Sequence, residues 1–205
     1  MKIRQPIVPP LLEEKSEYED EMQNGLYKQC TIADLNQKNF IMNECRMQNV
    51  FFENCTFENI DAMDIIFENC DLSNIEFNDG TVHRIIFKNC RLVGCDFSAS
   101  SLKDIQFFNC LSTYANFSFS KTDTIYFDKC DLSYSSFNET KLKNVEFHEC
   151  KLQRCEFLHC PLDNIDVSDS DIEGLIVSND SLRGMIVNEN QAIALARLLG
   201  LNIKE

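Results

Sequence analysis

The chain has 205 residues, 44% of them hydrophobic, which suits one domain of ordinary size with a sizeable core. Its 33 acidic residues outnumber 19 basic ones, and the net charge of −14 argues against direct binding to nucleic acid or to anionic membranes. No apolar run approaches the roughly 20 residues of a membrane span, and the N-terminal stretch lacks the features of a secretory signal. We therefore expect a cytoplasmic protein whose eleven cysteines stay reduced.

Residues 1–29 lie outside the main register of the sequence and are expected to form an N-terminal arm, or a cap over the first coil. They contain three prolines, followed by the acidic run EEKSEYEDE at 13–21. Just after them, ADL (33–35) and KNF (38–40) suggest an alternative register that slips before Met42. The regular repeat is assigned to residues 30–189.

A five-residue unit organises this second segment. All eleven cysteines fall on multiples of five, and twelve of the sixteen phenylalanines lie two residues past a multiple of five. We call the Phe/Leu position the centre of a unit and the position two residues earlier its small slot. Neither the helix period of 3.6 nor the strand period of 2 explains this spacing. We infer that the chain turns a corner every five residues, so that both positions point inward, and the units keep this register from Met42 to Val187.

A second period of twenty residues sets the cross-section. Small slots repeat at this interval, as in the series Cys70, Cys90, Cys110, Cys130 and Cys150. Four units per coil give a four-sided rod in which like residues stack about 4.8 Å apart. We name each side after one of its centres: the Phe57 side, the opposite Phe67 side, and the Leu72 and Leu102 sides between them.

The units CDLSN (70–74), CDFSA (95–99), ANFSF (115–119) and CDLSY (130–134) resemble the pentapeptide-repeat pattern A(D/N)LXX. The resemblance implies an all-β, right-handed quadrilateral β-helix. Family members with a similar end-to-end plan, the Qnr and MfpA-type proteins, bind DNA gyrase or topoisomerase IV as DNA mimics. Plasmid-type Qnr proteins carry loops that matter for quinolone protection, and the unbroken register here leaves no room for them.

Residues 190–205 change period and are expected to form a short C-terminal helix and tail. Asn188 and Gln191 resemble a capping box, and Gly200 is a natural stop. A solenoid needs its last coil capped, and QAIALARLLGLNI is similar to the segment that builds a two-fold dimer in Qnr proteins. A monomeric cap and a homodimer both stay open. The residues assigned to dimerisation are Ala192, Ile193, Leu195, Ala196, Leu198, Leu199 and Leu201.

No catalytic or metal-binding pattern emerges, so we expect a non-enzymatic protein without cofactor or metal. The closest cysteine spacing is five, with none of the CxxC pairs common in zinc sites. Cysteine is also a small hydrophobe that suits an inward slot. The three histidines fall on different sides and do not converge. Asp180 would occupy a small slot, and because a buried carboxylate needs donors, we expect the last coil to open there.

Charge is concentrated on the two Phe sides. The Phe67 side carries seven acids against Lys88 and Lys129, and the Phe57 side carries six acids with no Lys or Arg. A narrow rod with rows of carboxylates predicts a DNA mimic that competes for a basic groove, with a protein such as DNA gyrase or topoisomerase IV as its partner. The alternative is a surface that merely keeps the rod soluble. The residues assigned to partner binding are Glu58, Glu76, Asp79, Asp96, Glu139 and Glu156.

A rival interpretation is a scaffold that docks another protein on a repeat face. Five apolar residues project outward on the Phe67 side, and a row of this kind can mark an interface. Single exposed apolar residues are also normal on protein surfaces. The row consists of Ile66, Ile86, Phe108, Tyr126 and Ile186.

Overall fold

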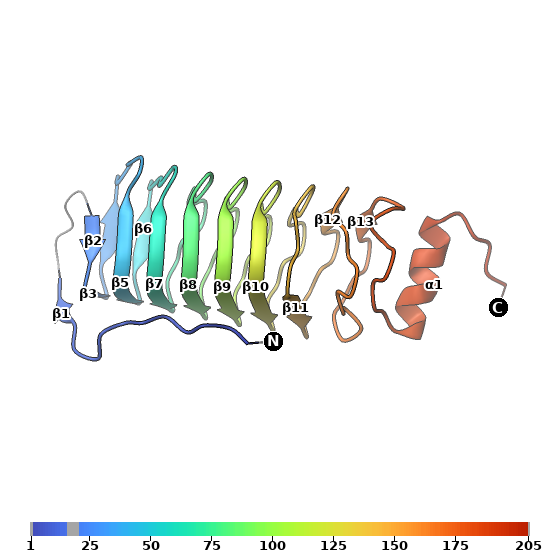
Figure 1. Ribbon diagram of the computed structural model, residues 1–205, viewed down its shortest axis with the longest axis horizontal. Coiled ribbons are helices and arrows are strands. Elements are labelled where there is room, and N and C mark those ends of the chain that lie inside the picture. Colours follow the sequence, from blue (N-terminus) through green and yellow to red (C-terminus); the bar gives the residue numbers. More distant parts are fainter. Residues whose placement is uncertain (1, 16–20, 205) are drawn as a thin grey trace.

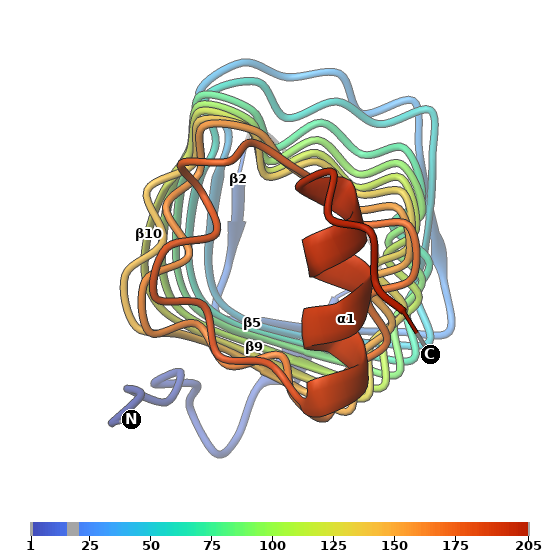
Figure 2. The ribbon, with the colours of Figure 1, turned by 90° about the vertical axis from the view of Figure 1, so that its right-hand side faces the viewer.

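The computed structural model describes residues 2–15 and 21–204, which form a parallel β-solenoid of about eight turns with a helix at its C-terminal end (Figure 1). Viewed along its axis, the coil has four sides (Figure 2). The predicted right-handed quadrilateral β-helix is therefore confirmed. Among the described residues, no helix is long and apolar enough to cross a membrane.

The strands pair in parallel, and all except the Glu13–Glu14 strand, which pairs with Gly25 and Leu26, are paired with their equivalent one coil away. Ile65 pairs with Ile85, and Ile85 with Ile105, so the register is the twenty-residue period of the sequence. The main sheet contains β1 (Glu13–Glu14), β2 (Glu21–Gln23), β3 (Gly25–Lys28), β5 (Ile41–Gln48), β7 (Asp61–Glu68), β8 (Thr81–Lys88), β9 (Ser101–Phe108), β10 (Lys121–Asp128) and β11 (Val145–His148). Two smaller sheets pair β4 (Thr31–Ala33) with β6 (Phe51–Glu53), and β12 (Glu156–Phe157) with β13 (Ile176–Val177).

From Asn24 to Asn164, a corner forms at the second residue after each centre, where the backbone takes a positive φ. Asn74 and Asn164 both have φ of 61° in this role. Asparagine, aspartate and glycine tolerate this left-handed conformation best, which explains their frequency at corners. Tyr114 and Tyr134 also occupy corners, with φ of 61° and 63°, so the repeat imposes the turn on residues that do not favour it.

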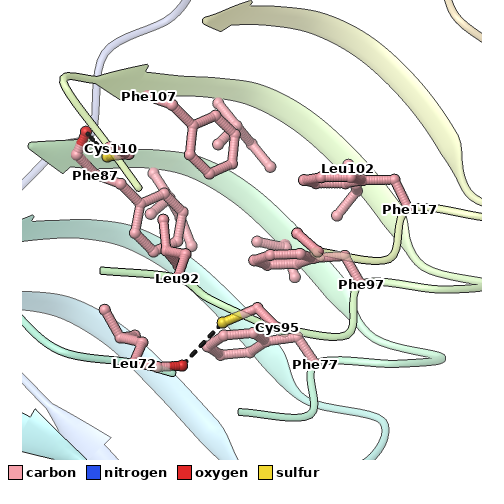
Figure 3. Packing of buried hydrophobic residues seen from close by; sticks show 14 of the residues in the cluster. Leu72, Phe77, Phe87, Leu92, Cys95, Phe97, Leu102, Phe107, Cys110 and Phe117 are labelled. Atoms are coloured by element: carbon pink, nitrogen blue, oxygen red, sulfur yellow. Dashed lines mark hydrogen bonds between the residues drawn. The ribbon is translucent and has the colours of Figure 1, made fainter. Parts of the chain in front are cut away.

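The interior consists of stacked phenylalanines and small slot residues (Figure 3). Phe107 stacks on Phe87 and Phe127, with ring centroids 4.9 and 4.6 Å apart, and meets Phe97 edge to face at 6.4 Å. Both arrangements are favourable for aromatic rings. The ten-residue alternation of phenylalanines therefore builds two columns that interlock across the rod.

Many slots hold cysteine or serine, which are small and also donate a hydrogen bond. Cys95 Sγ donates to the Leu72 carbonyl at 2.8 Å (Figure 3), and Ser100 Oγ donates to the Phe77 carbonyl at 2.7 Å. Ten of the eleven cysteines are buried, and Cys30 is half-buried. Burial raises the pKa of the Cys155 thiol to about 12, so it stays protonated. The structure thus gives the cysteines a packing role.

The N-terminal boundary differs from the predicted one. β2 and β3 already pair with β5 at twenty-residue spacing, and Met22 and Tyr27 are buried, so the coil register reaches back to Glu21 rather than to residue 30. The expected slip near residues 33–40 is wrong, because Ile32 pairs with Phe52 in the ordinary register. The motifs ADL and KNF suggested a slip because Leu35 and Phe40 resemble centres, whereas both are large, buried residues in small slots.

The last coil opens at Asp180, as expected for a carboxylate in a slot position. The Asp180 side chain is 71% exposed, and Ser181 takes over the slot, donating to the Phe157 carbonyl at 2.9 Å. Helix α1 (Glu189–Leu198) then crosses the open end (Figure 2). The predicted capping box of Asn188 and Gln191 is present, and the Gln191 amide also donates to two carbonyls of the coil beneath, at 2.8 and 2.7 Å.

Candidate functional site

The carboxylates assigned to partner binding lie on the Phe57 side in two groups. Glu76 and Asp96 are bridge partners on adjacent coils, and Glu156 stands three coils further along the same column. Asn116 and Ser136 occupy the column between them. Asp79 and Glu139 lie at the corner beyond this column, and both are exposed. Within this column the acidic row is therefore interrupted by a neutral middle, Asn116 and Ser136, and the coils of Asp96 and Glu156 are about 14 Å apart at the usual strand spacing.

One of the six acids is neutralised, which corrects the prediction of a side without Lys or Arg. Lys38 lies one coil before Glu58, and its Nζ is 2.6 Å from the Glu58 carboxylate. Lys38 lies in the segment for which the sequence suggests a slipped register, so the sequence count of this side does not include it. The other five acids form no ion pair within the described residues. Their contacts include amide hydrogen bonds, such as the one that Asn138 Nδ2 donates to Glu156 Oε2 at 2.8 Å.

The neutral middle carries exposed aromatic rings that sequence reasoning missed. Tyr114 and Tyr134 are 60% and 46% exposed, and Phe119, at the other corner of the same coil as Tyr114, is 59% exposed. All three lie two residues past a centre, and the two tyrosines are twenty residues apart. That spacing was a usable signal, because it predicts one stacked column.

The Phe67 side is acidic as well, but two of its acids have a cationic partner. Arg46, which the sequence count of this side omits, lies 3.7 Å from Glu68, and Lys129 lies 3.5 Å from Glu149. His148 Nδ1 is 2.6 Å from an oxygen of Asp169. Exposed pairs of this kind contribute little to stability, but they reduce the field that the side presents to a partner.

Of the two expectations for the N-terminal segment, an arm or a cap over the first coil, the structure shows an arm that runs back along the rod, far beyond the first coil (Figure 1). Its residues 2–15 follow the corner where the Leu102 side meets the Phe67 side. Arg4 forms an ion pair of 2.6 Å with Asp104, and its backbone N–H donates to the same carboxylate at 3.1 Å. Gln106 Nε2 donates to Gln5 Oε1 at 3.2 Å. The arm therefore occupies the edge of the Phe67 side.

Asp64 anchors the arm at a second point. Its carboxylate accepts the Ile7 N–H at 2.8 Å and a two-pronged interaction from Arg84 at 2.7 and 2.6 Å. Burial of Asp64 opposes ionisation, but the hydrogen bonds from Arg84 and Ile7 outweigh it and hold the pKa of Asp64 below its ordinary value. Ile66 and Ile86 of the predicted apolar row are half-buried next to this contact.

The residues assigned to dimerisation lie on both faces of α1 and, for Leu199 and Leu201, just beyond its C-terminal end. Leu195 is 8% exposed and packs onto the core, so it caps the last coil and is not available to a partner. Four of the others are large and exposed: Ile193 (42%), Leu198 (57%), Leu199 (49%) and Leu201 (59%). Ala192 is exposed and Ala196 is half-buried.

The geometry defines a class of protein: a parallel β-solenoid whose interior is filled by stacked side chains and whose four flat sides face outward. Sequence models of known families match in three places. The model described as pentapeptide repeat region matches residues 60–137, that of pentapeptide repeats (8 copies) matches residues 130–169, and that of the SV2A/B/C luminal domain matches residues 13–97. Among curated proteins, no sequence matches the chain.

The chain belongs to the pentapeptide-repeat family. Among solved structures, it is similar to a trypsin-treated variant of QnrB1, a plasmid-mediated fluoroquinolone resistance protein, with 19% identity and a TM-score of 0.52, covering 88% of this chain and 100% of that one. It is also similar to HetL from the cyanobacterium Nostoc sp. strain PCC 7120, a pentapeptide repeat protein involved in heterocyst differentiation regulation, with 12% identity and a TM-score of 0.59, covering 82% and 91%. At these identities the likeness concerns the fold.

Proposed function

We propose that this protein is a non-enzymatic acidic rod that acts in the cytoplasm as a DNA mimic and binds a type II topoisomerase, DNA gyrase or topoisomerase IV, through its Phe57 side. The observation that carries the proposal is the set of five carboxylates on this side without a cationic partner among the described residues: Glu76, Asp79, Asp96, Glu139 and Glu156. A basic DNA-binding groove attracts such a side through the same electrostatic term that attracts DNA.

The alternative function is a scaffold for a protein partner of another kind. The structural likeness to HetL, a protein involved in the regulation of differentiation, is compatible with this alternative. The two functions differ in one measurable property. A DNA mimic competes with duplex DNA for the partner, whereas a scaffold leaves DNA binding by the partner unchanged.

The first experiment is a gyrase supercoiling assay with the full chain at low salt. We expect inhibition at about 1–10 µM protein, and relief of quinolone inhibition is measured in the same assay. Absence of any effect at tens of micromolar contradicts the topoisomerase proposal.

Two variants that lose the same number of charges test whether the Phe57 side is the one that binds the partner. In the first variant, all five unpaired acids of the Phe57 side become Gln or Asn, and we expect inhibition to weaken at least about tenfold because the salt-dependent attraction is lost. The control removes the same number of charges from the Phe67 side. Equal loss in the two variants would show that net charge alone acts. The control positions are Glu68, Glu146, Glu149, Asp166 and Asp169.

We further propose a homodimer in which the α1 helices and the tails beyond them pack through their exposed apolar residues. Changing Leu198 and Leu201 together to Glu removes two of the four large exposed apolar residues while leaving Gln191 and Leu195 to cap the last coil. Light scattering should give the mass of two chains for the native protein and of one chain for this variant. Arg197→Gln on the same helix is the control. A native protein with the mass of one chain contradicts the dimer.

A further inference from the structure

Three flat side chains form a stack on the corner where the Leu72 side meets the Phe57 side. The rings of Tyr114 and Tyr134 are 5.0 Å apart and inclined by only 12°. The guanidinium carbon of Arg154 lies 5.9 Å from the Tyr134 ring centroid. Tyr134 therefore contacts the Tyr114 ring with one face and the Arg154 guanidinium with the other. This arrangement indicates that a tyrosine ring in this column can bind a guanidinium on its face.

The outer face of Tyr114 has no such neighbour in its own column. Gly94 occupies the equivalent position one coil earlier, with φ of 68°, and contributes no side chain. Beyond it stands Asn74, whose Oδ1 lies 2.6 Å from the place that a Cβ on Gly94 would take. The Asn74 side chain therefore lies over Gly94, and we call the place between this side chain and the outer face of the Tyr114 ring the slot.

Carboxylates border this slot on the Phe57 side. Glu76 follows Asn74 by two residues, and Asp96 follows Gly94 by two residues, in the column that runs beside the corner. Glu76 is exposed and Asp96 is partly exposed, and neither forms an ion pair among the described residues. The slot therefore combines a ring face, an oxygen acceptor and two negative charges.

We infer that this slot receives an arginine side chain of a basic protein partner and so forms a specific contact at the edge of the acidic side. A guanidinium is flat, stacks on aromatic rings, and presents several donors in its plane, whereas an ammonium is a compact point charge without a stacking face. Aromatic and arginine residues dominate the central contacts of protein interfaces. A nucleobase could also stack on Tyr114, but its phosphates would meet Glu76 and Asp96, so charge favours the basic protein.

The inference rests on the proposed docking role of the Phe57 side, but not on the identity of the partner. Its test therefore uses synthetic probes, a fluorescent oligo-arginine peptide and an oligo-lysine peptide of equal length. Their affinities for the full-length protein are measured by fluorescence anisotropy at one fixed, low salt concentration. The readout is the ratio of the two affinities, which cancels the attraction that depends on charge alone.

Tyr114→Ala should lower the preference for the arginine peptide by about two- to fivefold, equivalent to about 0.5–1 kcal/mol for an exposed cation–π contact. Tyr114→Phe should keep the preference, because the ring remains. Phe51→Ala, which removes a ring that is 53% exposed elsewhere on the rod, should leave it unchanged. The alanine variant is expected to fold, because Ala99 already holds a corner of this type with φ of 56°.

The same affinity ratio in the native protein and in Tyr114→Ala would overturn the inference. Equal weakening of both peptides by Tyr114→Ala would overturn it as well, because the ring would then not distinguish the two cations. The gyrase assay tests the topoisomerase proposal independently of the peptide measurement. If the protein has no effect on gyrase but Tyr114→Ala still lowers the preference for the arginine peptide, the slot binds arginine and its partner is a basic protein other than a topoisomerase.

Discussion

The Phe57 and Phe67 sides are built alike but present different surfaces. Both stack phenylalanine centres at twenty-residue spacing, and both carry more acids than bases. On the Phe67 side, basic residues and His148 match several acids, and the N-terminal arm occupies one edge. On the Phe57 side, Lys38 neutralises only Glu58. Similar composition therefore produces one side with several ion pairs and an edge covered by the arm, and one side on which a single acid has a cationic partner among the described residues.

The strongest way to disturb this comparison is to break the anchor of the arm. Asp64→Ala should lower the free energy of unfolding by about 2–3 kcal/mol, because it leaves the half-buried Arg84 without its carboxylate. Glu58→Ala removes an exposed pair and should cost less than about 0.5 kcal/mol. Urea denaturation measures both. Equal losses of unfolding free energy in the two variants would show that the Asp64 and Glu58 ion pairs contribute equally to stability.

Arg4→Ala should release the arm while leaving the coil intact. The Ile7 N–H is held by Asp64, and we expect its hydrogen exchange to accelerate by about tenfold when the neighbouring ion pair to Asp104 is lost. Lys2→Ala, on the same arm, is the control. Unchanged exchange at Ile7 in Arg4→Ala would show that the contact with Asp64 holds the arm alone.

Acid should release the arm only at a pH below the ordinary pKa of aspartate. The pKa of Asp64 is depressed in the folded protein, so the stability that its ionised form contributes is present above the ordinary aspartate value near 4 and is lost only as the pH falls through the lower, folded value. The Ile7 amide signal in an NMR titration should therefore stay constant through about pH 4 and move below it. The Asp64→Asn variant should lack this transition. Movement of the native signal above about pH 4 contradicts the account.

Lys38→Gln should have the smallest effect. Removal of this exposed lysine changes the unfolding free energy by less than about 0.5 kcal/mol but frees the Glu58 carboxylate. Binding of a basic partner to the Phe57 side should then strengthen by about twofold at low salt. Lys129→Gln, its counterpart on the Phe67 side, should not change that binding. Weaker binding by Lys38→Gln would mean that the lysine itself contacts the partner.

Much of the fold could be predicted because each position in the repeat has one physical role. Centres and slots assigned by counting, such as Phe107 and Cys95, are buried as expected. The path of the arm could not be predicted, because Arg4 and Asp104 are a hundred residues apart and no periodicity links them. The pairing of Lys38 with Glu58 was predictable in principle, since they are twenty residues apart, but large side chains in the slots of that coil obscured its register.

The central claim is that the Phe57 side is the free acidic surface. Carboxylate labelling of the native protein, followed by mass spectrometry, tests it directly when performed alone and in complex with gyrase. We expect Glu76, Asp96 and Glu139 to be protected in the complex, and Glu149 and Asp166 to be labelled as before. Protection of Glu149 and Asp166 with continued labelling of the Phe57 side would contradict the account.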